Sequence, residues 1–389
     1  MLTDKQILEI RSRFNIFQRK IYLNSCSQGA LSDAVQTGLG EYIASWHKQG
    51  SPWETWMGRY EEARTAFAQF INASPDEVAI VTSASAGINS VASALSFQER
   101  KKVVMGEFEF PTMGHVWLAQ RVRGAEVQFV SAEGNRIPTV NYEKMIDRNT
   151  NIVPLTHVCF KNGFRSEVNA VTQLAHAAGA AVMLDDYQDC GTRPVDVKAM
   201  NLDFFVTGTL KYLLGPPGLA FMYVRKELIS SLVPTVTGWF AQTNPFAFDP
   251  QHIDLSPTAR RFESGSPSVP NVYAAVPGFQ LLQEIGMENV ASHIKRLAQS
   301  LLRCARDLGI CAKTPADSAG PLVVLQCKDS NLLVQKLAES DIAASNRHDG
   351  LRISFHVYNT MDDVQAVARV LEKHINLLVL DGASVGNYD

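Results

Sequence analysis

The chain has 389 residues, of which 46% are hydrophobic and 19% charged, and its formal net charge is -3. This balance gives no electrostatic basis for binding nucleic acid or an anionic membrane, both of which require clustered Lys and Arg. No window reaches the roughly 18 apolar residues of a membrane helix, and the first ten residues mix charges into their apolar positions, unlike a signal peptide. We therefore expect a cytoplasmic protein that acts on a small molecule.

Short apolar runs alternate with helical patterns through the first two-thirds of the chain, which indicates βαβ units and an α/β fold. A helix is predicted over 170–178, among the segments that separate the predicted strands. Those strands are, in chain order, 77–81, 102–105, 126–130, 151–155, 181–184, 204–206 and 219–224.

From about residue 250 the pattern changes to longer helices. The predicted elements are helices over 274–285 and 290–307, strands over 321–325 and 351–355, and a closing amphipathic helix over 362–375. We predict a large domain over 1–250, whose N-terminal arm of about residues 1–20 packs on a smaller α+β domain over 251–380. The polar tail 381–389 is expected to be loose.

The turn 82–89 follows an early predicted strand and opens a predicted helix. Backbone N–H groups and the helix dipole converge on an anion at such a place, although a small-residue turn is also a common helix N-cap. Ser85, Ala86 and Gly87 are the candidate phosphate contacts here.

One acid and one amine follow neighbouring predicted strands. Asp185 comes directly after the apolar run 180–184, and Lys211 lies between the strand 203–206 and the Gly/Pro-rich turn 215–218. Carboxyl ends of parallel strands share one sheet edge, where open α/β folds bind ligands. A desolvated lysine forms Schiff bases, and pyridoxal phosphate needs such an amine together with a carboxylate for its pyridine nitrogen.

Cysteine spacing gives no sign of a metal site. The six cysteines are scattered without a CxxC or a zinc-binding His/Cys pattern, so we expect reduced thiols and no metal.

The motif 185–188 and the run around Lys211, together with segments from Ile21 to Thr360, resemble the class V aminotransferase family of fold-type I pyridoxal phosphate enzymes. That family includes cysteine desulfurases, kynureninases, isopenicillin N epimerase and C–S lyases. The resemblance implies a large domain with a mostly parallel seven-stranded sheet, a smaller α+β C-terminal domain and pyridoxal 5'-phosphate as cofactor.

The resemblance also implies roles around the cofactor. Asp185 would bind the pyridinium nitrogen, Gln188 the ring hydroxyl oxygen, and Lys211 would form the Schiff base. Phe110 stands where many relatives have a histidine on the ring, and it can stack but cannot transfer protons. The implied phosphate contacts are Ser85, Ala86, Gly87, Thr207 or Thr209, and Ser266, which would reach the other subunit of a homodimer with shared active sites.

The substrate is expected to be an amino acid. Arg352 lies inside an apolar strand, where an arginine requires an anionic partner, and the resemblance implies that it grips the substrate carboxylate. Asn24 is a further substrate-binding candidate, and Arg347 is a candidate for a second anion or a structural ion pair. Candidates for the side-chain pocket, with core packing as the alternative, are Trp53, Trp56, Tyr60, Trp239 and Phe240.

Departures from the desulfurase pattern favour another side of the family. Desulfurases carry a nucleophilic cysteine shortly before the arginine strand, and 343–350 holds none here. We predict an enzyme that forms an external aldimine, removes Cα–H with Lys211 and eliminates a group from Cβ, as kynureninase-like and C–S lyase-like relatives suggest. Transamination, epimerisation and C–C bond chemistry are alternatives, as is a non-catalytic binding protein on the same fold.

Overall fold

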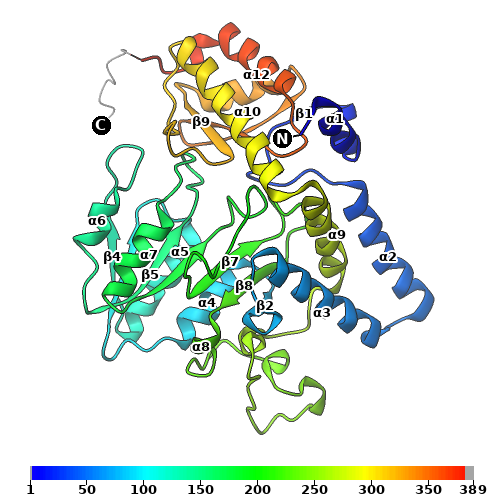
Figure 1. Cartoon of the computed structure of the whole chain (residues 1–389), viewed down its shortest axis with the longest axis vertical. Helices are drawn as coiled ribbons and strands as arrows, with labels where there is room; N and C mark the ends of the chain where they lie inside the picture. The colour runs from blue at the N-terminus through cyan, green and yellow to red at the C-terminus, as the bar shows by residue number, and fades with distance from the viewer. Residues whose placement is uncertain (1, 382–389) are drawn as a thin grey trace.

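A seven-stranded sheet forms the centre of the computed structural model, which describes residues 2–381 (Figure 1). Strand β8 is antiparallel to both neighbours and the other pairs are parallel. This confirms the predicted mostly parallel sheet, and the predicted strand ends lie within two residues of the observed ones. In spatial order the strands are β2 (Val78–Val81), β8 (Ala220–Val224), β7 (Phe204–Gly208), β6 (Ala181–Asp185), β5 (Thr150–Thr156), β3 (Lys102–Gly106) and β4 (Glu126–Val130).

Side chains that alternate along these strands divide between two hydrophobic cores, one on each face of the sheet. In β6, Val182 and Leu184 belong to one core and Met183 to the other. Asp185 therefore shares the face of Met183. The first core includes residues of α3 (Trp53–Phe70), α7 (Val168–Ala177) and α9 (Val269–Ile285), and the second includes residues of α4 (Ala84–Ala94) and α5 (Pro111–Ala119).

The C-terminal part has its own antiparallel sheet, in the order β11 (Ser345–Arg347), β12 (Gly350–Ser354) and β9 (Leu322–Gln326). Its helices are α10 (Met287–Asp307), α11 (Ser330–Ala338) and α12 (Met361–Lys373). The remaining elements are α1 (Asp4–Ser12), α2 (Asp33–Gln49), α6 (Thr139–Glu143), α8 (Lys226–Ile229), and the parallel pair β1 (Ile21–Tyr22) and β10 (Ile342–Ala343).

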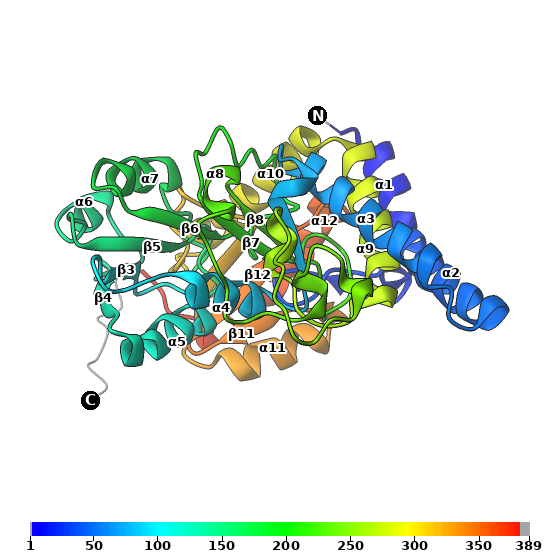
Figure 2. The same ribbon diagram turned by 90° about the horizontal axis from the view of Figure 1, so that it is seen from below.

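The N-terminal segment contacts the C-terminal part. Arg11 pairs with Asp363 at 2.7 Å, and the Phe14 ring meets the Tyr358 ring edge-on at 4.8 Å between centroids. Helix α9, in contrast, packs against α2 and α3 although it lies beyond residue 250, and Figure 2 shows α2 extending from the body beside it. The division of the chain at residue 250 stays a prediction.

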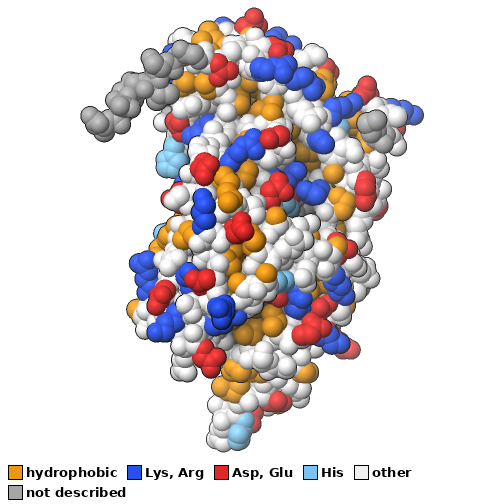
Figure 3. Space-filling view, turned by 60° about the vertical axis from the view of Figure 1, so that its left-hand side comes forward, with side chains coloured by type: hydrophobic (Ala, Val, Ile, Leu, Met, Phe, Trp, Pro, Cys, Tyr) orange, Lys and Arg blue, Asp and Glu red, His pale blue; other side chains and the backbone are white. Residues whose placement is uncertain are grey.

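The surface carries mixed charges. Lys and Arg side chains are interspersed with Asp and Glu on the face shown in Figure 3. No helix within residues 2–381 combines the length and apolar character that crossing a bilayer requires. Beyond Asp381, the tail that we expected to be loose lies outside the described residues.

Candidate active site

A cavity of about 270 Å³ lies where β5, β6 and β7 end, beside the start of α4. This is the sheet edge at which open α/β folds bind ligands. The cavity brings together five residues predicted from the sequence, Ser85, Phe110, Asp185, Gln188 and Lys211. Residues that the sequence prediction missed also line it, among them Ser27, Ser83, Thr112, Thr156 and Tyr187.

Lys211 lies in the turn after β7. Glycines allow other parts of the chain to pack closely against this turn. A Cβ added to Gly208 would lie 2.2 Å from the Tyr187 ring, and one added to Gly29 would lie 2.2 Å from the Lys211 carbonyl oxygen. The Lys211 Nζ lies 4.2 Å from the centroid of the Tyr187 ring. Burial lowers the pKa of Lys211 to about 8, and Asp185 opposes this change.

Asp185 is buried at the end of β6, and its Oδ1 accepts a hydrogen bond from the Tyr187 N–H at 3.0 Å. Burial raises the pKa of Asp185, whereas the charge of Lys211 lowers it. No ion pair joins these two side chains within residues 2–381, so the cavity separates an amine from a carboxylate. Gln188 Nε2 donates to Cys26 O at 3.1 Å, and Gln188 Oε1 has no partner among the described residues.

The two amides predicted as phosphate contacts in the turn before α4 already have partners within that turn. The Ala86 N–H donates to Ser83 Oγ at 3.1 Å, and the Gly87 N–H donates to Ser83 O at 3.1 Å. Both predicted amides are therefore used within the turn, and neither residue lines the cavity. Ser85 does line it, and its hydroxyl donates to Thr112 Oγ1 at 3.1 Å.

Thr207 and Thr209 differ in what their hydroxyls can still bind. Thr209 Oγ1 donates to Pro216 O at 2.7 Å, which uses its single proton inside the Gly/Pro turn. Thr207 Oγ1 is buried beside the Cys190 thiol and has no other partner among the described residues. Of the two, Thr207 keeps the freer hydroxyl, although neither residue lines the cavity.

Arg352 is buried in β12 directly behind the cavity wall. Its Nη2 donates to Ser27 Oγ at 2.9 Å and to Ser345 Oγ at 3.0 Å, and its Nη1 donates to Phe160 O at 3.3 Å. In the described part of the chain no carboxylate pairs with it. A guanidinium charge is therefore buried beside the cavity without a counterion.

The other predicted substrate contacts lie farther out. Arg347 is exposed and donates to Asn346 O at 2.8 Å. Asn24 forms a bridge with Ser354 of β12. Neither lines the cavity, so a contact with substrate stays a prediction for both.

Phe110 stands at the cavity mouth and is 42% exposed, so it is not a core residue. Its ring meets the ring of Phe160 edge-on, with 5.0 Å between centroids, and Lys211 Nζ lies 5.8 Å from its centroid. A half-exposed apolar ring therefore lies in the same cavity wall as the amine.

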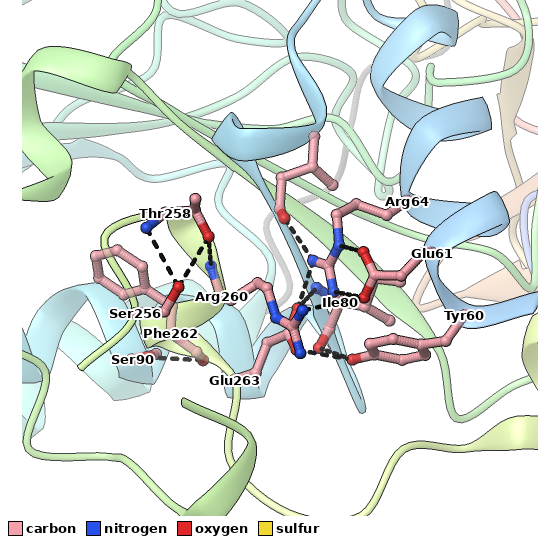
Figure 4. Close-up of polar contacts among 11 residues, drawn as sticks. Tyr60, Glu61, Arg64, Ile80, Ser90, Ser256, Thr258, Arg260, Phe262 and Glu263 are labelled. Carbon is pink, nitrogen blue, oxygen red and sulfur yellow. Dashed lines mark hydrogen bonds and ion pairs between the residues drawn. The ribbon is translucent and has the colours of Figure 1, made fainter. Parts of the chain in front are cut away.

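Ser266 is exposed and does not line the cavity of its own chain. The segment before it is fixed by a buried network (Figure 4). Glu263 accepts hydrogen bonds from Arg64 Nη1 at 2.5 Å, from the Ile80 N–H at 2.9 Å and from the Tyr60 hydroxyl at 3.0 Å. Because Ile80 belongs to β2, this network ties the approach to Ser266 to the strand that leads into α4.

The aromatic side chains proposed for the substrate pocket do not line this cavity. Trp56 packs with Val269 and Tyr273, and the rings of Tyr60 and Phe240 meet edge-on at 5.9 Å. Trp56, Tyr60 and Phe240 are buried and pack in the core, which was the alternative to a role in the substrate pocket.

Two residues near the site had no recognisable signal in the sequence. Cys26 is buried with its Sγ 4.0 Å from Ser27 Oγ and 3.9 Å from Ser345 Oγ, the two hydroxyls that also bind Arg352. Glu109 is buried behind Thr156. Thr156 itself ends β5 opposite Asp185 in the strand register, so the rule that located Asp185 could also have located it.

A second buried cluster consists of His157, Asp186 and Asp189, groups that can bind metals. His157 Nδ1 lies 2.6 Å from Asp186 Oδ1, and Arg165 pairs with Asp189 at 3.2 Å. The arginine compensates negative charge that a cation would otherwise neutralise, so we assign no metal to this cluster. The expected absence of a metal stays a prediction.

The aminotransferase class V family model matches residues 28–367. The chain belongs to the aminotransferase class V family. A relative from Bacillus subtilis (strain 168), the uncharacterized aminotransferase YcbU, is 32% identical over 95% of this chain and 98% of its own length. The prediction of an enzyme of this pyridoxal phosphate family is thereby confirmed.

Solved structures share the fold of this family member. The apo cysteine desulfurase of Thermococcus onnurineus NA1 matches with a TM-score of 0.88 and 21% identity, covering 97% of this chain and 99% of that one. The cystine C-S lyase C-DES, in complex with its product cysteine persulfide, matches with a TM-score of 0.84 and 20% identity, covering 92% and 98%. The fold-type I architecture is confirmed, whereas the exclusion of desulfurases stays a prediction.

Proposed function

We propose that this class V family member uses pyridoxal phosphate to eliminate a sulfur-containing group from Cβ of an amino acid, as a C–S lyase does. The observation that carries the proposal is the pair Lys211 and Asp185, which line one cavity without an ion pair between them, with Asp185 buried and Lys211 half-buried. The uncompensated guanidinium of Arg352 behind the wall supports a carboxylate substrate.

The residues present fit the cofactor. Its aldehyde needs an amine that is partly deprotonated near neutral pH, and a pKa of about 8 gives Lys211 this property. Its ring nitrogen needs a carboxylate, which Asp185 supplies. The unpartnered Oε1 of Gln188 is a buried polar atom that a ligand would satisfy.

When bound, pyridoxal phosphate supplies an aldehyde for the substrate amine and a ring that withdraws electrons. Asp185 would hold the ring nitrogen, Phe110 would cover the ring face, and Arg352 would orient the substrate through its carboxylate. Lys211 would accept the Cα proton, because the other titratable residues of the cavity wall are Asp185 and Tyr187, and burial raises the pKa of Tyr187. Phe110 cannot transfer protons, so Lys211 would serve as the base.

The proposed net reaction balances without an oxidant or reductant. The Cα–H and Cβ–S bonds break, the proton goes to Lys211, and the electron pair of the Cβ–S bond leaves with the thiolate. A cysteine derivative and water thereby give a thiol, pyruvate and ammonium. Transamination is the second candidate, and the 32% identity to a protein named as an aminotransferase favours it.

The test combines colour with product analysis. Purified protein supplied with pyridoxal phosphate should gain a visible absorbance band, and borohydride should fix the cofactor on the peptide that contains Lys211. Incubation with a panel of cysteine derivatives and other amino acids should then release thiol, pyruvate and ammonia. A yellow protein that forms only keto acid from an amino donor, and needs a keto-acid acceptor, would favour transamination instead.

Cys26 separates a lyase from a persulfide-forming desulfurase. The segment 343–350 carries no cysteine, and Cys26 is buried beside Ser27. Replacing Cys26 with Ala should therefore leave thiol release intact, with Cys327→Ala as the control because Cys327 is also buried. Loss of turnover in Cys26→Ala alone, together with a persulfide on Cys26 of the wild type, would contradict the lyase.

The active unit that we propose is a homodimer with shared active sites. Phe248 and Ile253 are 71% and 73% exposed on the segment that projects between α8 and α9 (Figure 1), and Ser266 is exposed nearby in sequence. Mixing Lys211→Ala subunits with Ser266→Asp subunits should restore activity, because one site of the mixed dimer then keeps both native residues. Absence of any restoration in a mixed dimer would argue against sharing.

A further inference from the structure

Glu109 is a second buried carboxyl group beside the cavity, and the proposed reaction gives it no role. It precedes Phe110 between β3 and α5, and it is 9% exposed. Both of its oxygens contact Thr156: Oε1 accepts from the Thr156 N–H at 3.0 Å, and Oε2 lies 2.6 Å from Thr156 Oγ1. Thr156 lines the cavity and is the register partner of Asp185. Glu109 therefore holds a cavity residue from behind.

The surroundings of Glu109 disfavour a carboxylate. The titratable groups that face it are Asp185 of β6, the hydroxyl of Tyr142 in α6 and the thiol of Cys159, none of which is a cation. In the described part of the chain it forms no ion pair. The pKa of Glu109 is raised to about 8, chiefly by burial, which outweighs the hydrogen bonds from Thr156 and Gly106 that lower it; the charge of Asp185 also raises it.

We infer that Glu109 is held as a neutral carboxylic acid that donates to Thr156 Oγ1 and thereby directs the Thr156 hydroxyl hydrogen into the cavity. A carboxylic acid satisfies both contacts, because its carbonyl oxygen accepts from the Thr156 amide while its hydroxyl donates. A carboxylate has no hydrogen to donate and would draw the Thr156 hydrogen away from the cavity. Glu109 is thus a positioning residue that acts through Thr156.

The inference rests on the proposed function, because the acceptor that the Thr156 hydroxyl would meet is an oxygen of bound pyridoxal phosphate. Glu109→Gln is the matched variant, since its amide offers the same acceptor and donor as the neutral acid. Glu109→Leu removes both, and Thr156→Val removes the hydroxyl while keeping the backbone amide. Thr156→Ser is the conservative variant that should restore the contact.

The first measurement uses the cofactor-free protein and asks only about protonation. The folded chain retains the Glu109 proton up to a pKa of about 8, whereas the ordinary pKa of a glutamate, as in the unfolded chain, is 4.5, so wild-type stability falls as pH rises between these values. The melting temperature of Glu109→Gln minus that of wild type should therefore increase from pH 5 to 8. Above pH 8 this difference should stay constant. A difference that does not change with pH would overturn the neutral acid.

The second measurement titrates pyridoxal phosphate at pH 7 and records the visible band. Glu109→Gln should bind as wild type does, whereas Glu109→Leu and Thr156→Val should each bind about tenfold more weakly, the equivalent of one hydrogen bond, with a shifted band that Thr156→Ser restores. Binding by Glu109→Gln as weak as that of Glu109→Leu, or wild-type binding by Thr156→Val, would overturn the inference. A wild type without any band would remove the proposed function instead, and the melting measurement would still decide the protonation.

Discussion

Two of the regions in which the protein buries charged side chains differ in how those charges are balanced. Around Glu263 the carboxylate is bonded by Arg64, by the Tyr60 hydroxyl and by a backbone amide (Figure 4). At the cavity, Arg352 is buried and Lys211 is half-buried, and neither forms an ion pair within residues 2–381. Burying an uncompensated charge costs several kcal/mol. The comparison indicates that the first region supports the fold, whereas the second is arranged for a ligand that brings complementary groups.

The sharpest test of this contrast removes the amine of the unbalanced region. Lys211→Ala should abolish the visible band of added pyridoxal phosphate and all turnover, because no other lysine of the described residues lines the cavity. The apoprotein should fold as wild type does, since the substitution removes a charge that burial disfavours. Absorbance spectra, product assays and thermal melting measure the three effects.

Lys144→Ala is the control for that experiment, because Lys144 is exposed at the end of α6. It should keep both the band and the activity. A band of normal intensity in Lys211→Ala would show that another amine holds the cofactor.

Breaking the balanced region should affect stability instead. Arg64→Met leaves Glu263 buried with no cation, which should lower the free energy of unfolding by about 3–5 kcal/mol. Urea unfolding of the apoprotein measures this loss. The double variant Arg64→Met/Glu263→Leu should recover much of it, because it leaves no unpaired charge. An Arg64→Met protein as stable as wild type would show that this network does not stabilise the fold.

Arg352→Met is the counterpart in the unbalanced region, and its effects should be reversed. Apoprotein stability should stay equal or rise, because the substitution removes a buried charge that no carboxylate of the described residues compensates. Binding of amino acids should weaken by about 2–5 kcal/mol, the value of a buried charged pair. Calorimetry on the loaded enzyme measures the substrate affinity, and melting of the apoprotein measures its stability. A large loss of stability with unchanged substrate affinity would show that Arg352 stabilises the fold and does not bind substrate.

The sequence alone predicted the sheet and placed Asp185 and Lys211 at its edge, for one physical reason. Strands buried on both faces form continuous apolar runs, so residues 181–184 and 204–206 could be predicted as strands. The polar residues that follow these runs could then be predicted to lie at the edge of the sheet. Asp185 and Lys211 were located in this way.

The residues that the sequence did not place depend on tertiary contacts. The amides of Ala86 and Gly87 are used by Ser83, and the hydroxyl of Thr209 is used by Pro216, which no spacing rule reveals. Glu109 approaches Thr156 from 47 positions away in the chain. Such contacts arise only when separate segments pack around the same sheet edge.

The smallest expected effect is a shift in the pH midpoint of pyridoxal phosphate uptake. Replacing two neighbours of Lys211 should shift this midpoint in opposite directions. The rate at which cofactor-free protein takes up pyridoxal phosphate should rise with pH through about 8, as Lys211 loses its proton. Asp185 raises the pKa of Lys211 and Arg347 lowers it, so Asp185→Asn should move the midpoint down and Arg347→Ala should move it up.

These rates are best measured in the Glu109→Gln background, because Glu109 also has a pKa of about 8. Arg347 is exposed, so its replacement should leave the fold intact and isolate the electrostatic effect. Shifts in the same direction for both substitutions would mean that the midpoint reports another group. Opposite shifts around a midpoint near 8 would assign it to the amine of Lys211, whose charge is unbalanced until a ligand arrives.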